Sequence, residues 1–271
     1  MIKFFRRIRQ QLLSQNRFSK YLLYAIGEIV LVVIGILIAL QVNNWNETKK
    51  EQIKIRKYAE SLIQDLENDL IMIDTIQYIA NEINIRIDSL SSIVRSNEID
   101  KISNLDVFCL SWMKLYRPYS WNRATFDELK SSEGLQLIKN SKITKKINEY
   151  EAFTRHMDED YKEDNVIANS AWGLMSSVIN VNYSNSIALR EVIRYSAVFG
   201  ALEDVFNSSE YQIAKSNRLP LNTENMTLLI NAVNQYNRLF FNIDIRIRIE
   251  LPRLIKDAEA LINMLKEEYQ L

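Results

Sequence analysis

The one histidine of the chain, His156, lies in the run HMDEDYKED, where its spacing to acidic residues could hold a divalent ion. Asp160 follows at i+4, on the same face of a helix, and Glu159 and Glu163 lie on adjoining faces. The alternative is a solvated acidic helix face, partly neutralised by neighbouring basic residues. We favour this alternative because di-iron bundles need a Glu-x-x-His motif on each of two helices. The sequence therefore predicts no metal site and no cofactor.

Other catalytic arrangements are missing from the sequence. Ser-His-acid catalysis would have to use His156 from a polar helix, and there is no Gly-x-Ser-x-Gly turn to present a nucleophile. A glycine-rich phosphate-binding loop is also absent. The single cysteine, Cys109, excludes an intramolecular disulfide framework and a cysteine-rich zinc site. We therefore predict that the protein is not an enzyme.

A second candidate site is the densest aromatic cluster of the chain, between residues 104 and 140. Aromatic rings and arginines, which often anchor binding surfaces, flank a break in regular helix at Pro118. The alternative is a pair of short helices that cap the end of a bundle with an aromatic core. The candidate partner or ligand surface consists of Tyr116, Arg117, Tyr119, Trp121 and Arg123.

The elements that would position these residues follow an apolar stretch, residues 21–42, whose only strongly polar side chains are Glu28 and Gln41. A helix of this length spans roughly 33 Å, against about 30 Å for the hydrocarbon core of a bilayer. Glu28 costs up to roughly 3 kcal/mol at mid-bilayer, but each Ile, Leu or Val returns about 0.3 to 0.6 kcal/mol. The stretch predicts one transmembrane helix.

One stripe of this helix contains Glu28, Gly35 and Ala39. Small residues four apart let helices approach closely in lipid, and an intramembrane carboxylate normally faces a partner or a cavity. The stripe is a candidate membrane helix interface. In the alternative, Glu28 extends toward the headgroups and Gly35 is incidental.

Residues 1–20 carry six basic side chains and no acid, with apolar residues at helical spacing. This pattern is typical of a basic amphipathic segment, which either lies on an anionic inner leaflet or only directs topology. No small-x-small cleavage site follows the apolar run, so we expect an uncleaved anchor. Long domains translocate largely regardless of charge, whereas the basic tail resists translocation. We expect the tail to be cytoplasmic and the bulk of the chain to be outside the cytoplasm.

Composition indicates long helices. The chain has 271 residues, 47% of them apolar, with only 5 glycines and 3 prolines. Its formal net charge is zero, which argues against a nucleic-acid partner. Three long helices are expected, with a proline-induced kink at Pro252 in the last. They cover residues 48–95, 141–182 and 223–269.

The first of these helices carries a coiled-coil-like seam of apolar residues at 3-4 spacing. A helix near 70 Å long needs long partners to bury such a seam. The fold class is therefore all-α: one N-terminal transmembrane helix followed by an elongated antiparallel bundle of three long helices with short capping helices. The seam runs through Ile73, Ile76, Ala80, Ile83, Ile87, Leu90 and Val94.

Residues 1–47 resemble the N-terminal hallmark of a family of uncharacterised, membrane-anchored bacterial proteins. Gly27 to Ile29 and the helix exit Asn43 to Asn46 are especially alike. A weaker resemblance returns at residues 125–140, where relatives more often have glycine at the position of Glu133. The resemblance implies a Gram-negative membrane protein and brings no activity, substrate or catalytic residue with it.

Three domains are predicted: a cytoplasmic tail (1–20), the transmembrane helix (21–42) and an extracytoplasmic helical bundle (43–271). We expect a single-pass protein of the bacterial inner membrane, with its bulk in the periplasm, that acts as an interaction or scaffold protein. The alternative is a ligand-sensing ectodomain that signals through a separate membrane partner. Expected partners are the membrane and either a second copy of the chain or another membrane protein, with no nucleic acid.

Overall fold

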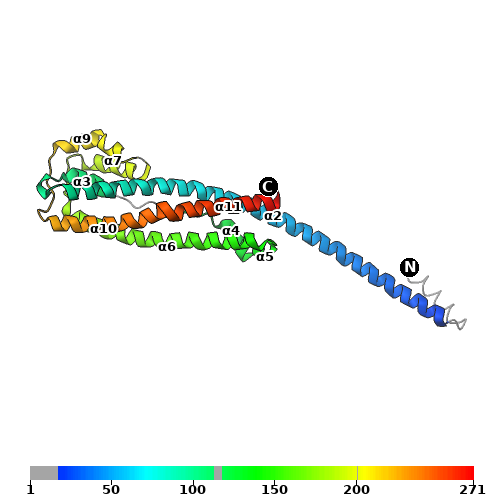
Figure 1. Ribbon diagram of the computed structural model, residues 1–271. Helices are drawn as coiled ribbons and strands as arrows, with labels where there is room; N and C mark the ends of the chain where they lie inside the picture. The colour runs from blue at the N-terminus through cyan, green and yellow to red at the C-terminus, as the bar shows by residue number, and fades with distance from the viewer. Residues whose placement is uncertain (1–17, 113–117, 200) are drawn as a thin grey trace. The chain divides into compact units, whose positions relative to one another are not determined.

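The computed structural model describes residues 18–112, 118–199 and 201–271 (Figure 1). All regular secondary structure in these ranges is helical, and they contain no strand. This confirms the all-α fold class. The chain separates into two compact units, Met1–Lys57 and Tyr58–Leu271.

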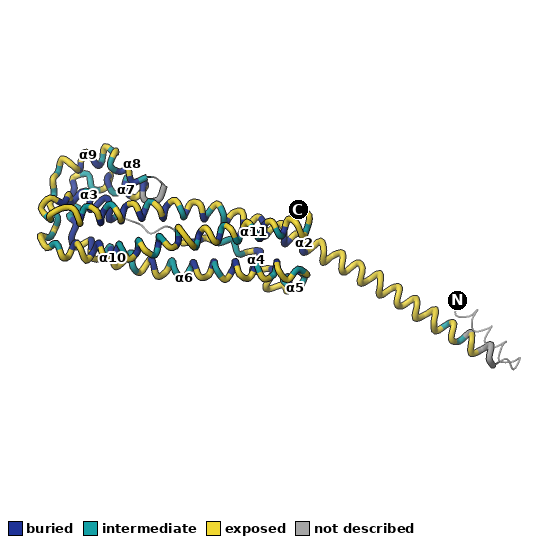
Figure 2. The backbone as a smooth tube through the Cα atoms, in the orientation of Figure 1, coloured by how far each residue is buried: buried dark blue, intermediate teal, exposed yellow. Residues whose placement is uncertain are grey.

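The first described helix, α2 (Phe18–Ser96), contains the whole apolar stretch. Large apolar side chains from Leu22 to Val42 are exposed (Figure 2). Among the described helices, this one alone is long and apolar enough to cross a membrane, a property that it shares with N-terminal signal sequences. The predicted domain limits at residues 20 and 42 stay predictions, and the compact helical unit begins at Tyr58.

The second unit is built around three long rods of helix that lie side by side (Figure 1). They are the part of α2 after Tyr58, α6 (Ser141–Val178), and the continuous series α10 (Met226–Ile245), η2 (Arg246–Glu250) and α11 (Leu251–Tyr269). The predicted seam is buried from Ile73 to Val94. The expectation of long partners that cover this seam is confirmed.

The directions of the rods differ from a simple up-down-up bundle. The α10–η2–α11 series runs antiparallel to α2 and also to α6, so α2 and α6 run in the same direction. Two rods can be parallel because the segment between α2 and α6, described over residues 97–112 and 118–140, returns to the start of the bundle before α6 begins. The contacts that fix these directions are Glu67–Lys266, Ser91–Asn237, Lys146–Asp257 and Asn242–Asp164.

The returning segment contains short helices at opposite ends of the bundle. The 3₁₀ helix η1 (Ile99–Lys101) and α3 (Asn104–Ser111) follow α2 directly, whereas α4 (Ala124–Ser131) and α5 (Gly134–Leu137) precede α6 (Figure 1). Between them, Asn122 donates from its backbone N to Asp69 Oδ1 at 2.8 Å. The predicted capping helices are therefore present, but they do not form one cap.

A second set of short helices joins α6 to α10. These are α7 (Ser186–Phe199), α8 (Leu202–Phe206) and α9 (Ser209–Ser216). The buried Arg86 guanidinium donates to Ser196 Oγ at 3.0 Å, which attaches α7 to α2.

The predicted disturbance at Pro252 takes the form of a π-helix. Proline has no N–H to donate to the carbonyl of Arg248, and its ring crowds that carbonyl in a regular α-helix. The wide turn η2 ends two residues before the proline and joins α10 to α11. Single π turns of this kind are frequent at functional sites.

Candidate metal centre

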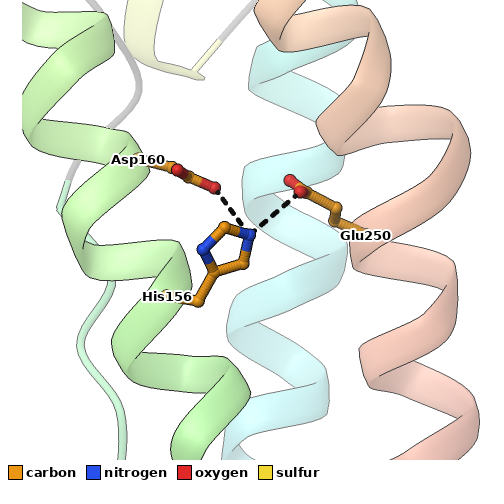
Figure 3. Close-up of side chains that lie close together, drawn as sticks. All are labelled: His156, Asp160 and Glu250. Carbon is orange, nitrogen blue, oxygen red and sulfur yellow. Dashed lines mark hydrogen bonds and ion pairs between the residues drawn. The ribbon is translucent and has the colours of Figure 1, made fainter.

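Three metal-ligating side chains meet between α6 and η2 (Figure 3). His156 and Asp160 are one turn apart on α6, and Glu250 is the last residue of η2. His156 Nε2 lies 3.2 Å from Asp160 Oδ2 and 3.4 Å from Glu250 Oε1. The three potential ligand atoms all lie within 4.8 Å of one another. This arrangement places one nitrogen and two oxygen ligands around a common point.

Arg246 supports the cluster from the other end of the π turn. Its Nη1 lies 2.6 Å from Glu250 Oε2 and 3.2 Å from Asp160 Oδ2. Its Nε lies 3.6 Å from Asp164 Oδ2, and Asp164 also accepts from Asn242 Nδ2 at 2.8 Å. One guanidinium is thus shared among three carboxylates.

Burial shapes the electrostatics of this cluster. It raises the pKa of Asp160, against the opposing effects of Arg246 and His156, because removal from water disfavours the carboxylate. For Arg246, burial alone would lower the pKa, but the attraction of Asp164, Glu250 and Asp160 outweighs it and raises the pKa. The Arg246 guanidinium therefore stays charged. A further positive charge nearby would favour the ionised form of Asp160.

The structure agrees with the interpretation of this region as a solvated acidic face for two of the acids and corrects it for Asp160. Glu159 and Glu163 are exposed, and Glu159 pairs with Lys162 as expected. Asp160 instead keeps only 15% of its side chain exposed, because it faces η2 rather than water. The sequence does not indicate Glu250 as part of this cluster, because it lies far from His156 along the chain. Only the nearby Pro252 predicts an irregular helix there.

The aromatic segment supplies a different polar network. Trp121 Nε1 donates to Asp158 Oδ1 at 3.0 Å. Arg123 Nη2 donates to Asp158 Oδ2 at 2.8 Å, and its Nε lies 3.3 Å from the buried Glu151. The side chains of Trp121 and Arg123 line a cavity of about 20 Å³, enough for roughly one water molecule.

Tyr119 is buried in this segment. Its ring stacks on that of Trp121 at a centroid distance of 4.9 Å and meets Tyr161 edge-on at 6.3 Å. Tyr116 and Arg117 lie outside the described residues. The candidate partner surface stays a prediction, and the contacts of Tyr119 favour the alternative in which its ring packs in the core.

The candidate membrane interface also stays a prediction. Glu28 is half-buried, Ala39 is exposed, and a Cβ added at Gly35 would meet no atom within 4 Å. Within this chain, a side chain at Gly35 would therefore enter open space.

Comparison with known families gives one match. The model of the Family of unknown function (DUF6090) covers residues 28–109. The chain is similar to that family over these residues. The match confirms the resemblance to a family of uncharacterised proteins. No curated protein and no solved structure matches the chain.

The matched residues of the family of unknown function begin within the apolar stretch and end at Cys109 in α3. They therefore include most of α2 and its buried seam. His156, Asp160 and Glu250 lie beyond the matched range. The candidate metal centre is thus a feature of this chain outside the family match.

Proposed function

We propose that the protein is a single-pass interaction or scaffold protein of the bacterial inner membrane, with its helical bundle in the periplasm. One observation carries the proposal. The apolar side chains from Leu22 to Val42 are exposed along a helix long enough to cross a bilayer. Contact of that apolar surface with water is unfavourable by about 25 cal/mol per Å². Burial of the surface in the hydrocarbon core of a bilayer removes this cost.

Two surfaces of the chain are proposed to contact partners. Within the membrane, the stripe of Glu28, Gly35 and Ala39 would allow close approach of a second helix, from another copy of the chain or another protein. Outside it, the aromatic segment around Trp121 and Arg123 offers ring and guanidinium groups. The proposal includes no nucleic-acid partner and no enzymatic reaction.

The test is affinity purification of the full chain from detergent-solubilised membranes. We expect the protein to resist extraction by alkaline carbonate and to bring a defined membrane protein, or a second tagged copy of itself, through purification. Release of the protein by carbonate would contradict membrane anchoring. Purification of the chain alone and monomeric would contradict the interaction role.

A second candidate function is a ligand-sensing bundle that signals through a separate membrane partner. The observation in its favour is the part-buried cluster of His156, Asp160 and Glu250, which joins two of the long rods. A ligand bound there would change how firmly α6 is held to η2. A small molecule or ion that stays with the purified protein would support this candidate over the scaffold role.

A further inference from the structure

We propose that His156, Asp160 and Glu250 bind one Zn²⁺ or similar transition-metal ion, and that the ion fastens α6 to the π-helix η2. The proposal concerns the bundle alone and does not depend on the membrane role. Imidazole and carboxylate together suit zinc better than magnesium or calcium, which prefer all-oxygen sites. Three protein ligands leave a fourth position for water, as in open zinc sites.

The spacing of the ligand atoms fits a tetrahedral ion. Zinc bonds to nitrogen and oxygen of about 2.0–2.1 Å place neighbouring ligand atoms about 3.3 Å apart in a tetrahedron. His156 Nε2 lies 3.2 Å from Asp160 Oδ2 and 3.4 Å from Glu250 Oε1. These two separations already have the required size, and the two carboxylate oxygens lie within 4.8 Å of each other.

The carboxylate oxygen of Asp160 that faces the cluster provides a second observation. Asp160 Oδ2 is buried and accepts no hydrogen bond from the described part of the chain, although Arg246 Nη1 and His156 Nε2 lie at ion-pair distance. These contacts offset part of the cost of burying the carboxylate, and a bond to a metal ion would offset more of it. A metal ion at the centre of the cluster would use that oxygen directly, with His156 neutral and its proton on Nδ1.

Arg246 acts as the positioning residue of this site. It holds Glu250 through Oε2, at 2.6 Å, and leaves Oε1 directed toward His156. Glu250 can therefore bind an ion through one oxygen and keep its guanidinium contact through the other. Outer contacts of this kind orient the ligands of metal sites.

The backbone of η2 presets the same arrangement. Arg246 and Glu250 are the first and last residues of the π-helix, and Pro252 follows it. The π turn brings both side chains to the side that faces α6, where Asp160 lies. Half of the His156 side chain is exposed, which gives an ion a route from solvent.

The experiment is Zn²⁺ titration of the full, detergent-purified chain after removal of metals with a chelator. Competition with a fluorescent zinc indicator measures affinity and stoichiometry, and thermal unfolding measures stabilisation. We expect one ion per chain and a higher Tm with Zn²⁺ than with the same concentration of Ca²⁺. Co²⁺ in place of Zn²⁺ should give the visible absorption of a tetrahedral site.

Matched variants locate the site. His156→Gln and Glu250→Gln should each weaken binding by at least about tenfold, since even outer contacts of metal ligands are worth 10–100-fold. Glu159→Gln, on the exposed face of the same helix, should bind as the original chain does. Circular dichroism verifies that His156→Gln, which changes a half-exposed side chain, stays folded.

Three outcomes would overturn the proposal: no zinc binding by the metal-free chain, equal affinity in Glu159→Gln and His156→Gln, or stronger stabilisation by Ca²⁺ than by Zn²⁺.

Discussion

Individual residues in this structure adopt backbone conformations that the neighbouring sequence does not predict. Glu133 is the clearest case, because its φ of 58° places it in the left-handed region between α4 and α5. The buried Gly134 follows it, where a Cβ would come within 3.0 Å of Leu129 Cδ2. A side chain at Gly134 would therefore be crowded, while Glu133 bears the backbone strain.

Glu133→Gly should stabilise the bundle. The left-handed conformation costs an L-residue about 1–2 kcal/mol, and the greater entropy loss of glycine offsets about 0.5–1 kcal/mol of this. We expect a net gain of about 0.5–1 kcal/mol, measured by urea unfolding of the bundle. Glu133→Ala keeps the strain and serves as the control. Lower stability of Glu133→Gly than of Glu133→Ala would show that the turn carries no strain, because only the entropy cost of glycine would then remain.

Tyr119 tests the role of the aromatic segment at the same scale. Because its ring is buried against Trp121 and Tyr161, Tyr119→Ala should cost about 3 kcal/mol or more and lower the Tm sharply. Partner capture is measured on the same variant. An unchanged Tm with loss of the captured partner would contradict packing and assign the ring to a binding surface.

The positions and buried faces of the helices agree closely with the apolar pattern of the sequence. The 3-4 spacing of α2 predicts its buried seam, and the polar caps of α3 and α6 lie where Ser103 and Asn140 accept from the next turn. Periodicity did not predict the parallel direction of α6, since local patterns contain no information on where a connecting segment travels. The path of residues 118–123 depends on tertiary contacts, such as that of Asn122 with Asp69.

The membrane stripe yields a prediction for α2. Gly35→Ile combined with Ala39→Ile should weaken association within the membrane about tenfold, because such contacts are worth only about 1–2 kcal/mol. A membrane two-hybrid assay or crosslinking measures the change. Leu37→Ile, elsewhere on the same helix, is the control. If the paired variant and Glu28→Gln both associate normally, the stripe faces lipid.

At the scale of the whole molecule, sequence predicts the class and the long rods but not the site. Scarce glycine and proline and the 3-4 spacing of apolar residues indicate an all-α chain, and one long apolar stretch indicates a membrane span. The candidate metal centre could not be foreseen in full, because His156 and Glu250 belong to different rods. Whether these two residues meet depends on the register between α6 and η2. Pro252 predicts an irregular helix near Glu250, but it does not predict this register.

The central claim, a bundle held outside the cytoplasm by one membrane helix, is tested most directly by cysteine labelling in intact spheroplasts. Cys109 is fully buried, and burial raises the pKa of its thiol, so it should give little background. Glu267→Cys introduces a reporter on the exposed face of α11, and Ser14→Cys introduces one in the basic tail. The account predicts that a membrane-impermeant thiol reagent modifies the Glu267→Cys variant in intact spheroplasts and the Ser14→Cys variant only after lysis. The reverse pattern would contradict it.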